Sequence, residues 1–170
     1  MGLAKFVIST VAVGIVAYSA LHAAHATALK GTQAFQRGKY EDALKFLKPA
    51  AESGDAGAMY VLGQMYASGR GIKKDEKLAA DYFFKSAKLG NAAAQQSLGS
   101  ALMLGEGITQ DMVEALKWFI ISARAGNKDA QAYTKRVGGL LSRDMQREAR
   151  MKARDWKTAR DKQKKAAEGN

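Results

Sequence analysis

Two adjacent stretches of the sequence decide the fold: Asp55–Gly90, DAGAMYVLGQMYASGRGIKKDEKLAADYFFKSAKLG, and Asn91–Gly126, NAAAQQSLGSALMLGEGITQDMVEALKWFIISARAG. Aligned without a gap at a shift of 36 residues, they share thirteen identical positions. Agreement of this kind at a fixed period is the sequence signature of a repeat architecture. The sequence therefore predicts two copies of one structural unit, over residues 55–90 and 91–126.

The first half of each unit predicts a helix. Small and apolar side chains recur there at helical spacing, as at Ala58, Leu62 and Met65 of the first copy. A Gly-x-Gly loop follows, at Gly69–Gly71 and again at Gly105–Gly107. Glycine reaches the positive φ angles through which a chain leaves a helix, so these glycines predict a turn and not a phosphate-binding loop.

The second half of each unit predicts a second helix. Asp75 and Asp111 occupy the same repeat position and are predicted N-caps, and Glu114 makes the latter a predicted capping box. The helix then carries an aromatic pair that is expected to lie in the core between helices. These pairs are Tyr82-Phe83 and Trp118-Phe119. Each unit is thus predicted to be a helical hairpin.

An earlier helix pair is predicted over residues 28–54. Its second helix is Tyr40–Ser53, whose apolar residues fall 36 positions before their counterparts in the next unit. Its first helix is Ala28–Arg37, joined by a short turn. Pro49 lies inside the second helix, where we expect it to kink or interrupt the helix because proline lacks an N–H.

Residues 127–170 predict a partial repeat followed by a long helix. The partial repeat is expected to end at Gly138-Gly139. Ser142 is the predicted N-cap of a helix that runs to about Lys165. Its apolar residues form one narrow stripe, consisting of Met145, Ala149, Ala153 and Trp156.

A lone hairpin cannot bury its apolar faces, so these units are expected to stack into an all-α solenoid of helix hairpins, an α/α superhelix. The units resemble Sel1-like repeats, which are relatives of tetratricopeptide repeats. The resemblance rests on Ala-x-x-x-Leu-Gly, Gly-x-Gly-Ile, the helix-opening Asp, Ala-x-x-Tyr/Trp-Phe and Ser-Ala-x-x-Gly. It implies a right-handed solenoid that acts as an adaptor or scaffold in signalling or envelope assembly. Leu102, Ser86 and Ser122 depart from the family pattern and are expected to alter only the local surface.

Residues 1–26 are predicted to be a signal peptide. Lys5 precedes an apolar stretch that ends at Leu21, and Ala24-His25-Ala26 supplies a small-x-small cleavage pattern. The stretch is short for a membrane-spanning helix. We therefore expect an exported, periplasmic protein cleaved before Thr27, with an uncleaved anchor in the inner membrane as the alternative.

The residue composition indicates no catalytic chemistry. The chain has no cysteine, and its two histidines, His22 and His25, both lie in the predicted leader. No thiolate, histidine base or usual metal-ligand cluster is then available to the mature chain. We expect no enzyme activity, no metal and no cofactor.

The positive charge is concentrated at the C-terminus. Of the net charge of +11, residues 127–170 contribute +7, from thirteen Lys and Arg against six Asp and Glu. The C-terminal helix is therefore interpreted in two ways. In the first, it caps the open end of the stack. In the second, it also binds anionic lipid or polymer, through Arg147, Arg150, Arg154, Lys157 and Arg160. Nucleic acid is an unlikely partner, because no aromatic side chains alternate with the basic ones.

The first helices of successive hairpins are expected to line the concave face of the stack, where partners bind. Positions that differ between the copies are candidates for recognition. They are Tyr60, Gln64, Gln96 and Ser100, with Gln95 and Gln131 in reserve. Two functions stay open: a periplasmic scaffold that binds a protein partner in the cell envelope, and an envelope-attachment protein that binds an anionic surface. The sequence leaves the oligomeric state open.

Overall fold

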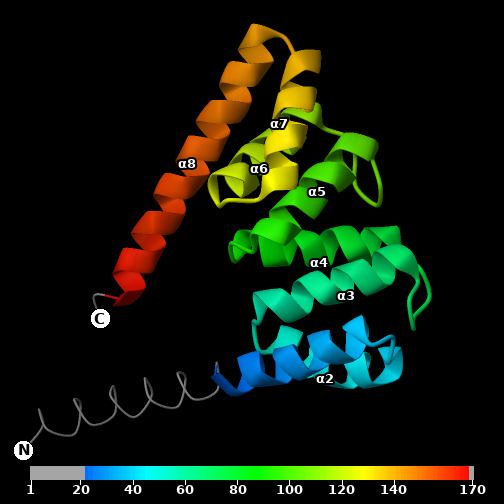
Figure 1. Ribbon diagram of the computed structural model, residues 1–170. Helices are drawn as coiled ribbons and strands as arrows, with labels where there is room; N and C mark the ends of the chain where they lie inside the picture. The colour runs from blue at the N-terminus through cyan, green and yellow to red at the C-terminus, as the bar shows by residue number, and fades with distance from the viewer. Residues whose placement is uncertain (1–21, 169–170) are drawn as a thin grey trace, which may run out of the picture. The chain divides into compact units, whose positions relative to one another are not determined.

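The computed structural model describes residues 22–168, and all regular structure in that range is helical, with eight helices and no strand (Figure 1). The predicted all-α fold class is confirmed. The chain divides into two compact units, one ending at Lys74 and one beginning at Asp75. Each unit is described by itself. The predicted signal peptide lies outside the described residues except for residues 22–26.

The first unit contains a helix over residues 22–36, then α2 (Tyr40–Glu52) and α3 (Ala56–Ser68). The first of these already includes residue 22, where the described residues start, and so extends N-terminal to the predicted start at Ala28. Its contact with α2 is close: a Cβ at Gly31 would lie 2.6 Å from Cγ of the buried Leu47. Only glycine leaves room for the two helices at this distance.

The sequence led us to expect that Pro49 would kink or interrupt α2, but it does not interrupt the helix. The helix continues to Glu52, and the N–H of Ser53 donates to the carbonyl oxygen of Pro49 at 3.0 Å. Proline removes one hydrogen bond to the preceding turn. Because Pro49 lies in the last turn of α2, the missing hydrogen bond affects only the end of the helix.

The second unit contains α4 (Glu76–Lys88), α5 (Ala92–Leu104), α6 (Met112–Arg124), α7 (Lys128–Leu140) and α8 (Arg143–Glu168). Helix α6 packs against α5, α7 and α8 and is the centre of this unit. Phe119 of α6 is fully buried and stacks on Tyr133 at 4.9 Å between ring centroids. Phe83 and Trp118 are buried as well, so the predicted aromatic core is confirmed for these three side chains.

The second glycine of each Gly-x-Gly loop lies against the start of an earlier helix. A Cβ on Gly107, whose φ is +69°, would lie 2.0 Å from the carbonyl oxygen of Glu76 at the start of α4. A Cβ on Gly71 would lie 2.2 Å from Cβ of Tyr40 at the start of α2. These glycines are therefore required both for the turn and for the packing of successive hairpins.

The predicted N-caps are present, but the predicted capping box is wrong. Asp75 accepts a hydrogen bond from the N–H of Leu78, and Asp111 accepts one from the N–H of Glu114, each at 2.9 Å. The Glu114 side chain does not reach back to Asp111. Its carboxylate pairs with two lysines instead, and the N–H of Asp111 donates to the carbonyl oxygen of Leu102 at 3.0 Å.

We expected the three departures from the family pattern to alter only the local surface. All three side chains are buried, so this expectation is wrong. Ser86 and Ser122 are fully buried and Leu102 is nearly so. Ser122 Oγ donates to the carbonyl oxygen of Ala92 at 2.7 Å, which ties α6 to the start of α5. A serine is accepted inside the stack because its hydroxyl finds a backbone acceptor.

The repeat does not end at Gly138-Gly139, because α7 continues through both glycines to Leu140. A Cβ on either glycine would meet nothing within 4 Å. The buried Val137 beside them holds this turn against its neighbours.

Candidate functional site

The predicted recognition residues of the first unit form one polar patch on α3. Tyr60 and Gln64 are half-buried, and Gln64 Nε2 donates to the Tyr60 hydroxyl at 3.0 Å. Their spacing of four residues places them on the same face of the helix. The bond orients both polar groups before any partner arrives.

The predicted residues of the second unit lie on α5, and one of them faces α7. Gln96 and Ser100 are both half-buried. Gln96 lines an open hollow with Asp129, Tyr133 and Arg136 of α7. The two predicted pairs belong to different units, so each is a separate candidate surface.

Of the two reserve positions, only Gln131 is exposed. Gln95 is 1% exposed, and its Nε2 donates to the carbonyl oxygen of Ala87 at 3.2 Å. Its interpretation as a residue of an open recognition face is therefore wrong. Its amide instead contributes to the packing of α5 against α4.

The apolar stripe of α8 packs on α6 of the last full repeat. Ala149 and Ala153 are fully buried, and Trp156 meets Trp118 of α6 edge-on at 5.7 Å between ring centroids. The helix begins as predicted, with the Met145 N–H donating to Ser142 Oγ at 3.3 Å. Met145 itself is exposed, so the buried stripe is one residue shorter than predicted.

A charged cluster fastens α8 to α6. Lys152 of α8 lies 3.0 Å from one carboxylate oxygen of Glu114, and Lys117 of α6 pairs with the other. Burial alone would raise the pKa of Glu114, but the hydrogen bonds from these lysines outweigh it and lower that pKa. Lys152 also lies 3.1 Å from a carboxylate oxygen of Glu148, and its hydrogen bonds to Glu114 and Glu148 raise the pKa of Lys152.

Arg160 makes a second attachment between α8 and the body of the unit. Its Nη2 donates to the carbonyl oxygen of Leu89 at 2.7 Å, at the C-terminus of α4, and its guanidinium lies 5.3 Å from the Trp156 ring centroid. A cation at this helix end is favourable for the helix dipole. A Cβ on Gly90 would lie 1.8 Å from Arg160 Nη1, so the contact requires glycine there. The Arg160 guanidinium therefore makes contacts within the fold that hold α8 against the rest of the unit.

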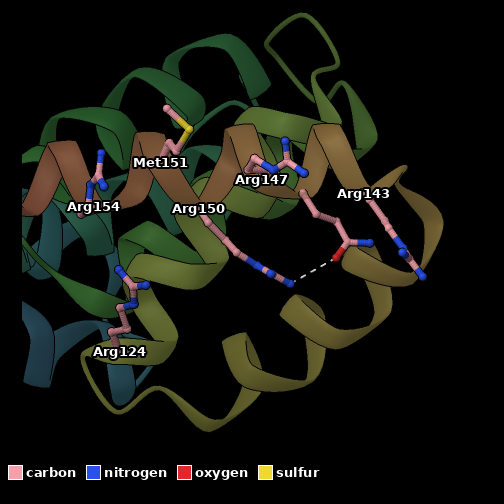
Figure 2. Close-up of a pocket in the computed structure, with 7 residues that line it drawn as sticks. Arg124, Arg143, Arg147, Arg150, Met151 and Arg154 are labelled. Carbon is pink, nitrogen blue, oxygen red and sulfur yellow. Dashed lines mark hydrogen bonds between the residues drawn. The ribbon is translucent and has the colours of Figure 1, made fainter.

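Five arginines gather beside the first half of α8, around a hollow of about 600 Å³ that we call the arginine hollow. Figure 2 shows Arg124, from the end of α6, facing the α8 side chains across this hollow. Its arginines are Arg124, Arg143, Arg147, Arg150 and Arg154. Three of the five predicted anion-binding residues lie here, whereas Lys157 and Arg160 line a separate pocket.

Few carboxylates neutralise the arginine hollow. Arg147 lies 3.7 Å from the exposed Asp144, and Arg154 pairs with its neighbour Asp155. Arg150 Nη2 donates to the amide oxygen of Gln146 at 3.1 Å. The hollow thus presents several guanidinium groups to solvent, a donor set suited to carboxylate or phosphate.

Comparison with known proteins identifies the repeat. The family model described as "Sel1 repeat" matches residues 24–55, 56–91 and 92–127. The chain belongs to the Sel1-repeat family. Sel1-repeat proteins are helical-repeat scaffolds that generally mediate protein–protein interactions. No curated protein sequence matches the chain significantly.

Solved structures of Sel1-type proteins are similar to this chain. The protective antigen c5321 of uropathogenic Escherichia coli, which displays an SLR fold, is 28% identical, with a TM-score of 0.74 over 78% of this chain and 29% of that one. A Sel1 repeat protein from Oxalobacter formigenes is 32% identical, with a TM-score of 0.60 over 63% of this chain and 44% of that one. Both are therefore matched over less than half of their length. Helicobacter pylori cysteine rich protein B shares the fold at 24% identity, with a TM-score of 0.58 over 68% of this chain and 90% of that one.

The sequence reasoning missed the start of the first Sel1 repeat and one of the arginines. The repeat begins at Ala24, and a signal was available: Ala24 and Gly31 lie 32 residues before Ala56 and Gly63. Arg124 gave no comparable signal, because only the packing of α8 on α6 brings it beside the α8 arginines.

Within residues 22–168, no helix is long and apolar enough to cross a membrane. The same residues contain no group of three or more His, Cys, Asp or Glu side chains placed to hold a metal ion.

Proposed function

We propose that this Sel1-repeat chain is an interaction scaffold of the cell envelope that binds a protein partner along its first-helix faces. The observation that supports this most is the pair of polar patches at equivalent helices, Tyr60 with Gln64 on α3 and Gln96 beside α7. All three side chains are half-buried, and Tyr60 and Gln64 are also held by their mutual hydrogen bond, so a partner that binds this pair orders few additional side chains.

Site-specific photocrosslinking tests this proposal. A photoreactive residue at Gln64 or at Gln96 is expected to capture the same envelope protein in living cells. Lys45 and Lys88, which are exposed on the second helices α2 and α4, are the matched control positions. Equal capture of the same protein from all four positions, or none from Gln64 and Gln96, would contradict the proposed face.

We propose further that the protein is exported and that the residues from Ala24 onward stay with the folded chain. Ala24 and Ala28 are buried, and His25 Nδ1 lies 3.0 Å from a carboxylate oxygen of Asp55. Cleavage before Thr27 would remove two of these residues from the first repeat. This favours the inner-membrane anchor over the predicted cleavage before Thr27.

Mass spectrometry of the protein isolated from membranes decides between these two states. A chain that retains Ala24 and fractionates with the inner membrane agrees with the proposal. A soluble periplasmic chain that begins at Thr27 would contradict it.

A second candidate function is attachment to an anionic surface through the arginine hollow. The observation that favours it is the set of five arginines with few carboxylate partners. Binding through exposed arginines should weaken as salt shortens the Debye length from about 10 Å at 0.1 M toward about 3 Å at 1 M.

Cosedimentation with anionic and neutral vesicles tests attachment. The double variant Arg124→Gln, Arg147→Gln is expected to lose most salt-sensitive binding to anionic vesicles. Its control, Lys162→Gln with Lys165→Gln, removes the same charge from α8 outside the hollow. Equal losses in both double variants would show a general charge effect and reject a specific site.

A further inference from the structure

A second pocket lies beside the later half of α8, and it differs in chemistry from the arginine hollow. It has a volume of about 290 Å³ and is bounded by α8, the end of α6 and the start of α5. We call it the α8 pocket. Its walls combine three kinds of group, each of which restricts the ligand.

The first group is a buried hydrogen-bond acceptor. Gln95 is 1% exposed and lines the α8 pocket, and its amide nitrogen is already used by the carbonyl oxygen of Ala87. That bond fixes the orientation of the amide, because a flipped amide would place two oxygens together. The amide oxygen Oε1 has no hydrogen-bond partner among the described residues. A buried acceptor left in this state costs free energy that a ligand N–H or O–H would recover.

The second group is cationic. Lys157 and Lys164 of α8 and Arg124 of α6 line the α8 pocket together with Arg160, and Asp161 is the single carboxylate there. The lining therefore carries a net positive charge. It favours an anionic ligand group.

The third group is apolar. Ile121 and Ala153 are buried in the wall, and the half-buried Trp156 lines the pocket as well. A small hydrophobic side chain can bury its surface there. Ligand sites commonly combine such apolar walls with a few fixed polar groups.

We propose that the α8 pocket binds an acidic peptide segment, in which an amide N–H, an apolar side chain and a carboxylate follow one another along the chain. The N–H donates to Gln95 Oε1, the apolar side chain packs on Ile121 and Trp156, and the carboxylate meets Lys157 and its basic neighbours. The carboxylate can be a chain terminus or an Asp or Glu side chain. This inference rests on the proposed protein partner and specifies what that partner presents.

Four acetylated peptides separate the two carboxylate sources. One ends in Ala-Leu with a free carboxylate, and its twin has a C-terminal amide. The third contains Leu-Glu and ends in an amide, and its twin has Gln for Glu. Titration followed by the nuclear magnetic resonance signals of the Trp156 indole and the Gln95 side-chain amide should show at least one charged peptide binding about tenfold more tightly than its neutral twin.

Three variants of the full chain test the pocket itself. Gln95→Met keeps the side-chain volume and removes the acceptor, and we expect it to weaken the charged peptide about fivefold to tenfold. Lys157→Gln changes an exposed side chain that the fold does not require, with an expected loss of about threefold. Lys162→Gln, on the same helix outside the pocket, should change binding less than about twofold.

Equal binding of charged and neutral twins, or no saturation by any peptide up to a few millimolar, would overturn the proposal. An equal loss of peptide affinity in Lys157→Gln and Lys162→Gln would also overturn it. So would binding to anionic vesicles that is tighter than binding to any peptide and that Gln95→Met leaves unchanged. If photocrosslinking from Gln96 still captures a partner in these cases, the scaffold function stands and only this inference fails. If capture is absent, the scaffold function fails whatever the peptides do.

Discussion

Helices α5 and α7 occupy the same position in successive repeats, yet they are held in place very differently. Both contain 13 residues, and both are capped by an asparagine side chain, Asn91 or Asn127, that accepts a backbone N–H at 3.0 Å. Helix α5 buries six residues and α7 only two. The reason is that α5 lies between α4 and α6, whereas α7 packs mainly on α6.

The comparison shows how the repeat array ends. A regular second helix after α7 would cover α7, but α8 packs against α6 instead. Figure 1 shows α8 turning back after α7 and running past α6. The outer face of α7 therefore stays largely uncovered. The helix that follows α7 does not continue the repeat, and this departure creates both the arginine hollow and the α8 pocket.

The largest expected effect is on the interior helix. Leu98→Ala on α5 removes a fully buried side chain and should lower the free energy of unfolding by about 2–5 kcal/mol. The same substitution at the 71% exposed Leu140 of α7 should change it by less than about 0.5 kcal/mol. Chemical denaturation followed by far-ultraviolet circular dichroism measures both. Similar losses would show that α7 is as deeply packed as α5.

The next prediction compares alanine substitutions at two glycines in equivalent turns. Gly126→Ala forces alanine to a φ of +93° with open space around it, at a cost of about 1–2 kcal/mol. Gly90→Ala has a similar backbone cost and also displaces the Arg160 guanidinium, which adds about 1 kcal/mol.

A double-mutant cycle isolates the second contribution to the Gly90→Ala effect. In an Arg160→Gln background, the excess cost of Gly90→Ala over Gly126→Ala should disappear. If the excess cost of Gly90→Ala persists in the Arg160→Gln background, displacement of Arg160 on α8 is not its cause.

A smaller effect is expected from the two equivalent caps. Asn91→Ala should destabilise the second unit by about 1 kcal/mol, because α5 unfolds only with its neighbours. Asn127→Ala should mainly increase hydrogen exchange in the first turn of α7, with a smaller change in the unfolding midpoint. Equal shifts of the midpoint in both variants would argue that α7 is not an end helix.

The smallest effect is a pH dependence at the junction of α6 and α8. Because the pKa of Glu114 is lowered in the folded chain, its pairing stabilises the fold above about pH 4.5, the ordinary value, and the contribution is lost as the pH falls through the lowered pKa. The stability difference between the wild type and Glu114→Gln should therefore shrink from neutral pH to about pH 3. Glu106→Gln, at an exposed position, is the control and should show no such trend. A difference that grows on acidification would contradict the assigned pairing.

Periodicity predicted most of the repeat, because the signals that define a hairpin are local. The N-caps at Asp75 and Asp111 and the core position of Phe119 follow from short-range spacing. The start of the first repeat was missed because a shorter turn changes the shift from 36 to 32 residues there.

The candidate sites were less predictable because they depend on contacts between residues far apart in the sequence. Gln95 carries no sign of burial, and its role is set by α4 and α8. Arg124 joins the α8 arginines only because Trp118 and Trp156 bring α6 and α8 together. The basic residues of α8 could be identified from the sequence, but their division between two pockets could not.

The central claim is that α8 is an integral part of the second unit and not a basic tail in solvent. Amide hydrogen exchange of the intact chain tests it most directly. We predict that the amides from Ala149 to Trp156 exchange as slowly as those of α6, because both helices open together. Exchange of this segment at the rate of an unfolded chain, while α6 stays protected, would contradict the claim and remove both pockets with it.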